Sequence, residues 1–191
     1  MKKVLALMLA LGLVVFPAVG CAPKEEQNVP DTAVEQEEGS SFGDLHTFTA
    51  KTLDGGGFSA ADFADYDVTV INIWSITCGP CVHEMPQLAE LKESLPENIN
   101  LITHCLDDEM YTEEITRILE EAGFDGTTLL LGDGDLMDLD RQVMYIPTTV
   151  FVDSQGNLLG KEIVGSSPDI RPLYLEHIND ALTQMGKDVI S

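Results

Sequence analysis

Basic residues are scarce in this chain. Its 191 residues include 10 lysines and arginines against 33 aspartates and glutamates, giving a formal net charge of −23. A surface this acidic repels nucleic acid and gains nothing from an anionic membrane surface. Nucleic acid is therefore excluded as a partner, and any contact with a membrane needs a source other than surface charge.

Long hydrophobic runs are also scarce. Residues 4–15 form one apolar run directly after Lys2 and Lys3, and 12 residues are too few for an ordinary membrane span. A positive start followed by a short apolar run predicts an export signal over residues 1–20. No run of 18 or more apolar residues follows it, so we expect a soluble domain on the outer side of a membrane.

The predicted signal ends in Ala18-Val19-Gly20-Cys21, which resembles the lipobox of bacterial lipoproteins. The resemblance implies cleavage before Cys21 and a diacylglycerol anchor on its thiol, which would tether the protein to the lipid bilayer at the extracytoplasmic face of a bacterial membrane. A plain secretory signal with Cys21 as a free thiol, or an uncleaved anchor, is the alternative. Residues 21–41 are acidic and lack aromatics, which predicts a disordered tether, and we expect the folded domain over 42–191.

Cysteine is rare too, with four residues, and two of them stand in the stretch WSITCGPCVHEMP over residues 74–86. The β-branched run before it, residues 68–73, predicts a strand buried on both faces, and a helix should follow over 81–95. Cys78 then lies where a strand ends and a helix begins, where the helix dipole favours the thiolate. This predicts Cys78 as the nucleophile and Cys81, one turn inside the helix, as a shielded resolving thiol.

The order of the predicted elements indicates an α/β fold with a mixed central sheet flanked by helices. A hairpin opens the domain, and strands and helices then alternate. We expect the hairpin over 48–58, a short helix over 59–63, strands over 68–73, 100–106, 127–131, 148–152 and 158–164, and helices over 81–95, 112–122, 135–144 and 168–185.

The pattern WxxxCGPC from Trp74, with Pro86 five residues past the second cysteine, resembles thioredoxin and more narrowly the TlpA/ResA group of membrane-tethered thiol-disulfide oxidoreductases. The likeness covers about residues 48–185. It implies a thioredoxin fold with an N-terminal β-hairpin and a central helix-strand insertion over about 112–131. It also implies a cis-proline at Ile146-Pro147, where the backbone pairs with an incoming substrate strand.

Three residues near the motif carry further expectations. Asn72 occupies the place of thioredoxin's buried aspartate, so that proton acceptor is absent. Glu84 stands where many TlpA/ResA members have a glutamate, which implies a role in deprotonating Cys81; the alternative is a solvated carboxylate in the first turn of the helix. Cys105 is expected to be a small buried hydrophobe, with an alternative disulfide at the active site as the second interpretation.

The resemblance implies an extracytoplasmic, lipid-anchored enzyme that uses the Cys78–Cys81 redox-active disulfide, without a cofactor, as a monomeric protein disulfide reductase. Its partners would be a disulfide-containing client protein and a DsbD/CcdA-like membrane electron donor. The client is not specified by the sequence, and apocytochrome c during cytochrome c maturation, a methionine sulfoxide reductase and a peroxidase all fit.

Three other uses of the cysteine pair remain open. A metal-binding or partner-capture module would need more ligands, and the candidates are His83, His104, Cys105 and two more distant histidines. His104 and Cys105 are adjacent on a strand and therefore point to opposite faces. A structural disulfide would close only a small loop. A thioredoxin-fold peroxidase would fit the position of Ser75 but expects a proline where Ile71 stands.

Overall fold

The structure is a computed structural model that describes residues 39–191; the predicted signal, Cys21 and residues 22–38 of the predicted tether lie outside the described residues. Its centre is a seven-stranded sheet with the order β2-β1-β5-β4-β3-β6-β7. The strands are β1 (Thr49–Thr52), β2 (Gly57–Ser59), β3 (Val68–Trp74), β4 (Ile99–Cys105), β5 (Thr128–Gly132), β6 (Thr148–Asp153) and β7 (Ile163–Val164). The helices are η1 (Ala60–Asp65), α1 (Gly79–Ser94), η2 (Glu109–Tyr111), α2 (Thr112–Ala122), α3 (Gly134–Gln142) and α4 (Ile170–Gln184).

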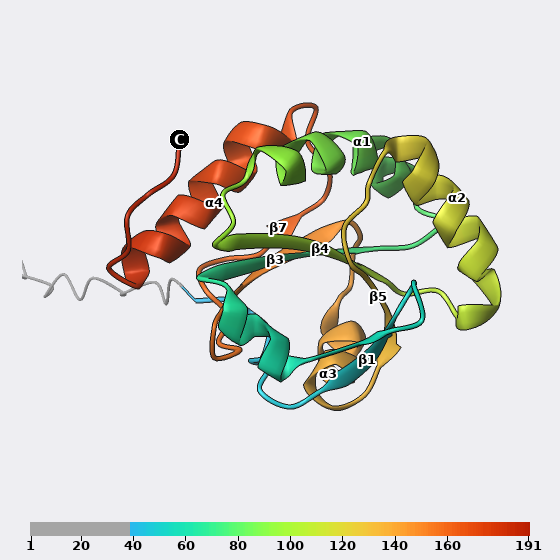
Figure 1. The fold of residues 1–191 in the computed structure, drawn as a ribbon, viewed down its shortest axis with the longest axis horizontal. Coiled ribbons are helices and arrows are strands. Elements are labelled where there is room, and N and C mark those ends of the chain that lie inside the picture. The colour runs from blue at the N-terminus through green and yellow to red at the C-terminus, as the bar shows by residue number, and fades with distance from the viewer. Residues whose placement is uncertain (1–38) are drawn as a thin grey trace, which may run out of the picture. The chain divides into compact units, whose positions relative to one another are not determined.

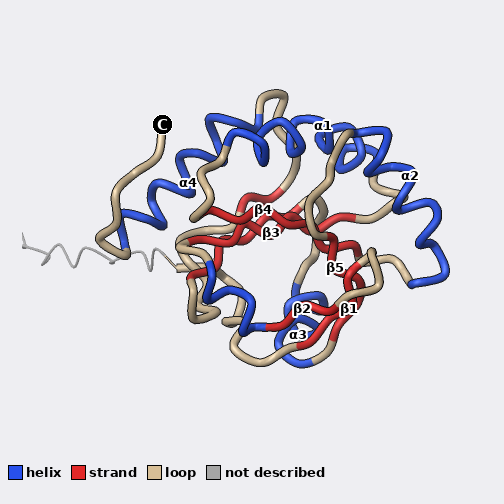
Figure 2. Tube along the Cα trace, viewed as in Figure 1, coloured by secondary structure: helices blue, strands red, loops and turns tan. Residues whose placement is uncertain are grey.

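Helices cover both faces of this sheet, as the sequence predicts. Figure 1 shows α1, α2 and α4 over one face and α3 over the other, with the strands between them, and Figure 2 shows the same layers by element type. The central strand β3 is buried along its whole length, because its alternate side chains enter two separate hydrophobic clusters. Across residues 39–191, no helix combines the length and the apolar character that a membrane crossing requires.

Three loops meet at one edge of the sheet. Strands β3 and β4 run parallel, and their last residues, Trp74 and Cys105, are partners in the register. Strand β6 runs antiparallel to β3, so its first residue, Thr148, pairs with Ile73 near the same edge. The segments after β3, after β4 and before β6 therefore converge, and the cysteine pair lies among them.

Two predicted boundaries are wrong. The strand expected over 158–164 is reduced to Ile163–Val164 and an isolated bridge from Leu158 to Val152, because Gly160 has a φ of 59° and breaks the extended backbone. The last helix does not begin at the expected Ser167–Pro168 signal. It begins at Ile170, where the Asp169 side chain accepts a hydrogen bond from the Arg171 N–H and caps the first turn.

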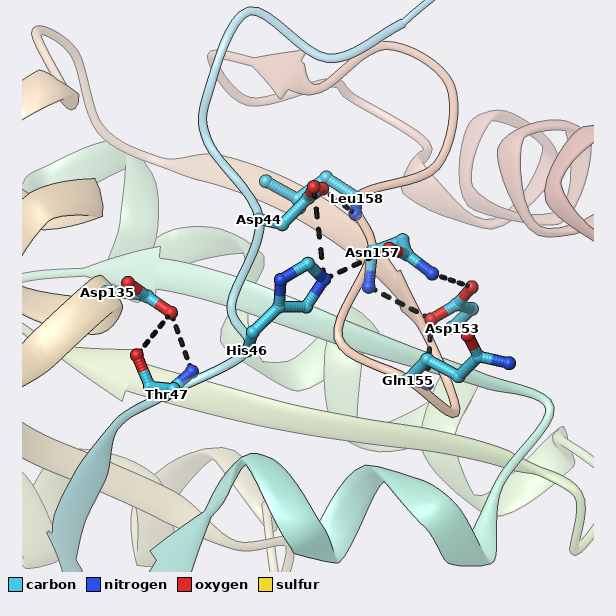
Figure 3. Close-up of polar contacts among 8 residues, drawn as sticks. All are labelled: Asp44, His46, Thr47, Asp135, Asp153, Gln155, Asn157 and Leu158. Carbon is cyan, nitrogen blue, oxygen red and sulfur yellow. Dashed lines mark hydrogen bonds and ion pairs between the residues drawn. The ribbon is translucent and has the colours of Figure 1, made fainter.

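The segment that enters the domain is fastened both at the far end of β6 and at the start of α3. Figure 3 shows the Asp44 carboxylate accepting from the Leu158 N–H at 2.9 Å, and the His46 ring within 3.0 Å of the Asn157 side-chain oxygen. The predicted tether also contacts the domain at its end, where the Ser41 hydroxyl donates to Glu162 at 2.5 Å. In Figure 3 the Asp135 carboxylate, at the start of α3, accepts from the Thr47 N–H at 2.6 Å.

Candidate active site

Cys78 and Cys81 are joined by a disulfide at the N-terminus of α1. Cys78 is the N-cap residue, and its sulfur accepts a hydrogen bond from the Cys81 N–H at 3.2 Å. Pro80 falls in the first turn, where a missing N–H costs no helix hydrogen bond. Cys78 is partly exposed and Cys81 is fully buried, so the two sulfurs differ in access as the sequence predicts.

The peptide between Ile146 and Pro147 is cis and lies beside the disulfide. The Ile146 carbonyl oxygen is 3.7 Å from the Cys78 sulfur, although 68 residues separate the two positions. Just before it, Met144 and Tyr145 are more than 70% exposed. An extended chain that approaches Cys78 would therefore meet exposed side chains beside the Ile146 carbonyl.

Glu84 is buried behind the disulfide, with only 2% of its surface exposed. Its Oε1 accepts a hydrogen bond from the Asn72 side-chain amide at 3.0 Å. Burial raises the pKa of Glu84 to about 7, and the Asn72 hydrogen bond opposes this rise. The alternative of a solvated helix carboxylate is therefore wrong, and Glu84 is a carboxyl group that titrates near neutral pH.

Thr149 and Tyr174 complete a polar cluster around Asn72. The Asn72 amide nitrogen is 3.1 Å from the Thr149 hydroxyl and 3.2 Å from the Tyr174 hydroxyl. Sequence reasoning missed both residues, since a threonine in a strand and a tyrosine in a helix carry no chemical signal by themselves. Thr149 is identified only by the antiparallel register, which makes it the direct partner of Asn72.

Asp107, which the sequence did not single out, holds the loop before the cysteines. Its carboxylate accepts from the Ile76 N–H at 2.7 Å and from the Ser75 hydroxyl at 3.3 Å. The Cys105 thiol lies 3.3 Å from the same carboxylate. An aspartate just after a strand that runs parallel to the strand before CGPC was the available signal, because parallel strands end at one edge.

Cys105 is fully buried and unpaired, in a hydrophobic cluster that also contains Trp74 and Cys81. Burial raises the pKa of its thiol to about 12, so it stays protonated at neutral pH. The prediction of a small buried hydrophobe is confirmed. Trp74 is also fully buried, and its indole N–H has no hydrogen-bond partner within the part of the chain that the structure describes.

The histidines considered as metal ligands point away from one another. His83 is exposed on α1, whereas His104 is fully buried and its ring nitrogen lies 2.7 Å from the Asp140 carboxylate of α3. His104 and Cys105 face opposite sides of the sheet, as predicted. Within residues 39–191, no three histidine, cysteine, aspartate or glutamate side chains are grouped so that they could hold a metal ion.

Comparison with known proteins gives a family match and one curated relative. The Redoxin family matches residues 24–178. The thiol:disulfide interchange protein HelX of Rhodobacter capsulatus is 31% identical over 102 residues, which are 53% of this chain and 55% of HelX. The chain thus spans about half the length of this relative.

Solved structures with the same fold are numerous. A proposed thiol:disulfide interchange protein DsbE from Chlorobium tepidum gives a TM-score of 0.61 at 22% identity, over 74% of this chain and 97% of that one. A proposed thioredoxin from Neisseria meningitidis gives a TM-score of 0.59 at 27% identity, over 74% of this chain and 91% of that one. The mixed sheet with helices on both faces is therefore a thioredoxin-like fold, as the sequence predicts.

Proposed function

Because the chain belongs to the Redoxin family, we propose that it is a thiol-disulfide oxidoreductase with the Cys78–Cys81 pair as its redox centre. One observation carries the proposal: Cys78 is partly exposed at the N-terminus of α1, and Cys81 is buried one turn inside that helix. A helix N-terminus stabilises an anion. The reduced pair therefore presents Cys78 as the attacking thiolate and keeps Cys81 for the second step.

In the reducing direction, the Cys78 thiolate attacks one sulfur of a client disulfide. The client's S–S bond breaks as a disulfide between Cys78 and the client forms. The Cys81 thiolate then attacks the Cys78 sulfur, and the client leaves with both of its sulfurs reduced. Two electrons have passed to the client and the Cys78–Cys81 disulfide remains. One client thiol receives the proton that Cys81 gives up, and the other takes a proton from water, into which Cys78 had released its own.

Glu84 is the proton acceptor for Cys81 in this scheme. It lies three residues after Cys81 on α1, a spacing that places side chains on one helix face. A base works best when its pKa is close to the working pH, and the pKa of Glu84 is about 7. Its carboxylate form accepts the Cys81 proton before Cys81 attacks the mixed disulfide.

Ile146 and Pro147 form the groove for the client in this proposal. The Ile146 carbonyl is 3.7 Å from the Cys78 sulfur, which suits a client strand that pairs with the backbone while its cysteine meets Cys78. Ile146 and the Gly-Pro dipeptide between the two cysteines match thioredoxin, a reductant with a potential of about −270 mV. We therefore assign the reductase direction.

The cellular setting is an extracytoplasmic membrane surface. The leader over residues 1–20 and the lipobox-like cysteine support a diacylglycerol anchor on Cys21, and the interchange activity in the name of HelX supports a protein client. A DsbD/CcdA-like membrane protein would return electrons to the oxidised pair. A Cys21→Ala variant should lose incorporation of labelled fatty acid and leave the membrane fraction; if it stays lipid-labelled, the anchor lies elsewhere.

Trapping of the client tests the proposal. Cys81→Ala cannot resolve the mixed disulfide, so it should accumulate in cells joined to its client, in adducts that reductant releases. The double variant Cys78→Ala/Cys81→Ala is the matched control and should capture nothing. The wild type should also accelerate insulin reduction by dithiothreitol. Absence of both adducts and insulin reduction would refute the oxidoreductase assignment.

A further inference from the structure

Four polar side chains from four elements meet behind the disulfide. Asn72 of β3, Glu84 of α1, Thr149 of β6 and Tyr174 of α4 are each no more than 2% exposed. The amide nitrogen of Asn72 stands at their centre, 3.0 Å from Glu84, 3.1 Å from Thr149 and 3.2 Å from Tyr174. A buried polar cluster of this kind is stable only when its donors and acceptors match.

The hydrogen-bond count of the cluster constrains the Asn72 amide. Its nitrogen carries two hydrogens but has three oxygen neighbours. One hydrogen goes to Glu84 and the other to the hydroxyl pair of Thr149 and Tyr174, whose oxygens are 2.6 Å apart and therefore share a hydrogen bond of their own. The Asn72 side-chain oxygen has no partner within residues 39–191, so the contacts of the nitrogen alone decide how the amide is turned.

We propose that Thr149 and Tyr174 are positioning residues that turn the Asn72 amide so that it donates to Glu84. This inference rests on the proposed function, because it gives the two hydroxyls a role in the second thiol step through Glu84. Thr149 is the cross-strand partner of Asn72 and lies two residues after Pro147. The strand that begins at the proposed client groove therefore also holds the cross-strand partner of Asn72, the residue that donates to Glu84.

The electrostatic surroundings of Glu84 are otherwise neutral at pH 7. Strands β3 and β6 contribute the uncharged Asn72 and Thr149. Strand β4 contributes Cys105, which lies on the α1 side of the sheet and whose thiol has a pKa of about 12. From α4 comes Tyr174, whose pKa burial also raises. On α1 itself, Cys81 is held in the disulfide of the oxidised protein. The Asn72 donor is thus the contact that opposes the effect of burial on the pKa of Glu84.

The test is a titration of the Glu84 carboxyl carbon by NMR in oxidised, ¹³C-glutamate-labelled protein, with Glu84→Gln to assign the signal. Thr149→Val removes one hydroxyl and keeps the shape, whereas Thr149→Ser keeps the hydroxyl. Tyr174→Phe removes the other hydroxyl, and Tyr66→Phe, at the opposite edge of the sheet, is its control. Loss of either positioning hydroxyl should raise the pKa of Glu84 by about half a pH unit or more, because the carboxylate loses a well-aimed donor.

Thr149→Ser and Tyr66→Phe should titrate as the wild type does. If Thr149→Val and Tyr174→Phe also leave the titration unchanged, or if Thr149→Ser shifts it as far as Thr149→Val, the positioning role is refuted. Should Tyr174→Phe fail to fold, the two Thr149 variants decide by themselves. The titration needs no turnover, so shifted titrations in a protein that traps no client and reduces no insulin would refute the proposed function and leave the positioning role intact.

Discussion

At Glu84 two physical effects oppose each other. Burial favours the neutral acid, and the Asn72 amide favours the carboxylate, with the balance at a pKa of about 7. An aspartate at position 72, as in thioredoxin, would place two carboxyl groups about 3 Å apart, and such groups cannot both ionise. Because asparagine is a donor without charge, the titration stays with Glu84, the acid on the cysteine helix.

Glu84→Gln should abolish the pH dependence of the second thiol step near neutrality. In the wild type, the rate should rise with pH through about 7, because only the carboxylate accepts the Cys81 proton. Loss of a general base costs typically about 100-fold or more, so the variant should be slower by that factor at pH 7.5. Stopped-flow measurement of client release from a preformed Cys78–client disulfide gives the rate; equal profiles for the two proteins would remove Glu84 from the mechanism.

Asp107→Ala should destabilise the protein and loosen the loop before Cys78. The change leaves the partly buried Ile76 N–H without its acceptor, which costs about 1 to 3 kcal/mol. Urea unfolding of the oxidised protein measures the loss. Glu113→Ala, which removes an exposed carboxylate from α2, should change the free energy of unfolding by less than about 0.5 kcal/mol. Equal urea-unfolding midpoints for the two variants would show that Asp107 does not stabilise the loop before Cys78.

The sequence predicted the residues that carry chemistry better than those that support them. Cys78, Cys81 and the cis-proline follow from one motif and one resemblance. The burial of Glu84 does not, because its position in the first turn of a helix fits both a solvated and a buried carboxyl group. Thr149 and Tyr174 could be found only once the β3–β6 register and the packing of α4 were known.

Among the elements, α3 is fastened to the sheet by a partly buried polar contact. The His104 ring on β4 is fully buried, lies 2.7 Å from Asp140 of α3, and has its other nitrogen 3.4 Å from the Leu129 carbonyl. Helix α3 ends at Gln142, five residues before Pro147. Its attachment therefore helps to fix the loop that carries the proposed client groove.

Asp140→Ala should weaken this attachment. The fully buried His104 imidazole loses its carboxylate partner, which should lower the free energy of unfolding by about 1 to 3 kcal/mol. Urea titration at pH 7 measures this loss. Hydrogen exchange should also speed up in α3 more than in α1. Asp138→Ala removes an exposed aspartate from the same helix and is the control. Unchanged exchange in α3 with Asp140→Ala would contradict the role of the contact.

Element types were more predictable than element limits. The β-branched run of β3 identifies a strand buried on both faces, since it contains no charged residue. The strand expected over 158–164 failed because a single glycine with positive φ interrupts it, and the sequence gives no sign of which glycines adopt that conformation. Asp169 and Ser167 were equally good helix caps by residue type, and only packing decides between them.

On the scale of the whole molecule, the entry segment and the redox centre lie at opposite ends of β6. Asp44 and His46 contact the turn after Asp153, whereas Pro147 precedes the first residue of the strand. A six-residue strand is about 20 Å long. The contacts of Asp44 and His46 therefore lie about one strand length from Pro147.

The stability of the whole domain should depend on pH through Glu84. Its pKa is about 7 in the native protein against an ordinary value of 4.5, so between these values the native state binds more protons than the unfolded chain. The contribution of Glu84 is fully present below about pH 4.5 and is lost as the pH rises through 7, a change of up to about 3 kcal/mol.

Glu84→Gln removes this titration but keeps a polar side chain of the same size. Its free energy of unfolding relative to the wild type should therefore rise from pH 4.5 to pH 8 and then level off, with the other acidic groups cancelling in the difference. Urea unfolding of the two oxidised proteins at half-unit pH intervals measures the curve. A flat difference over this range would mean that Glu84 has the same pKa in the folded and unfolded chain, and the neutral-pH titration on which its role as a base depends would be absent.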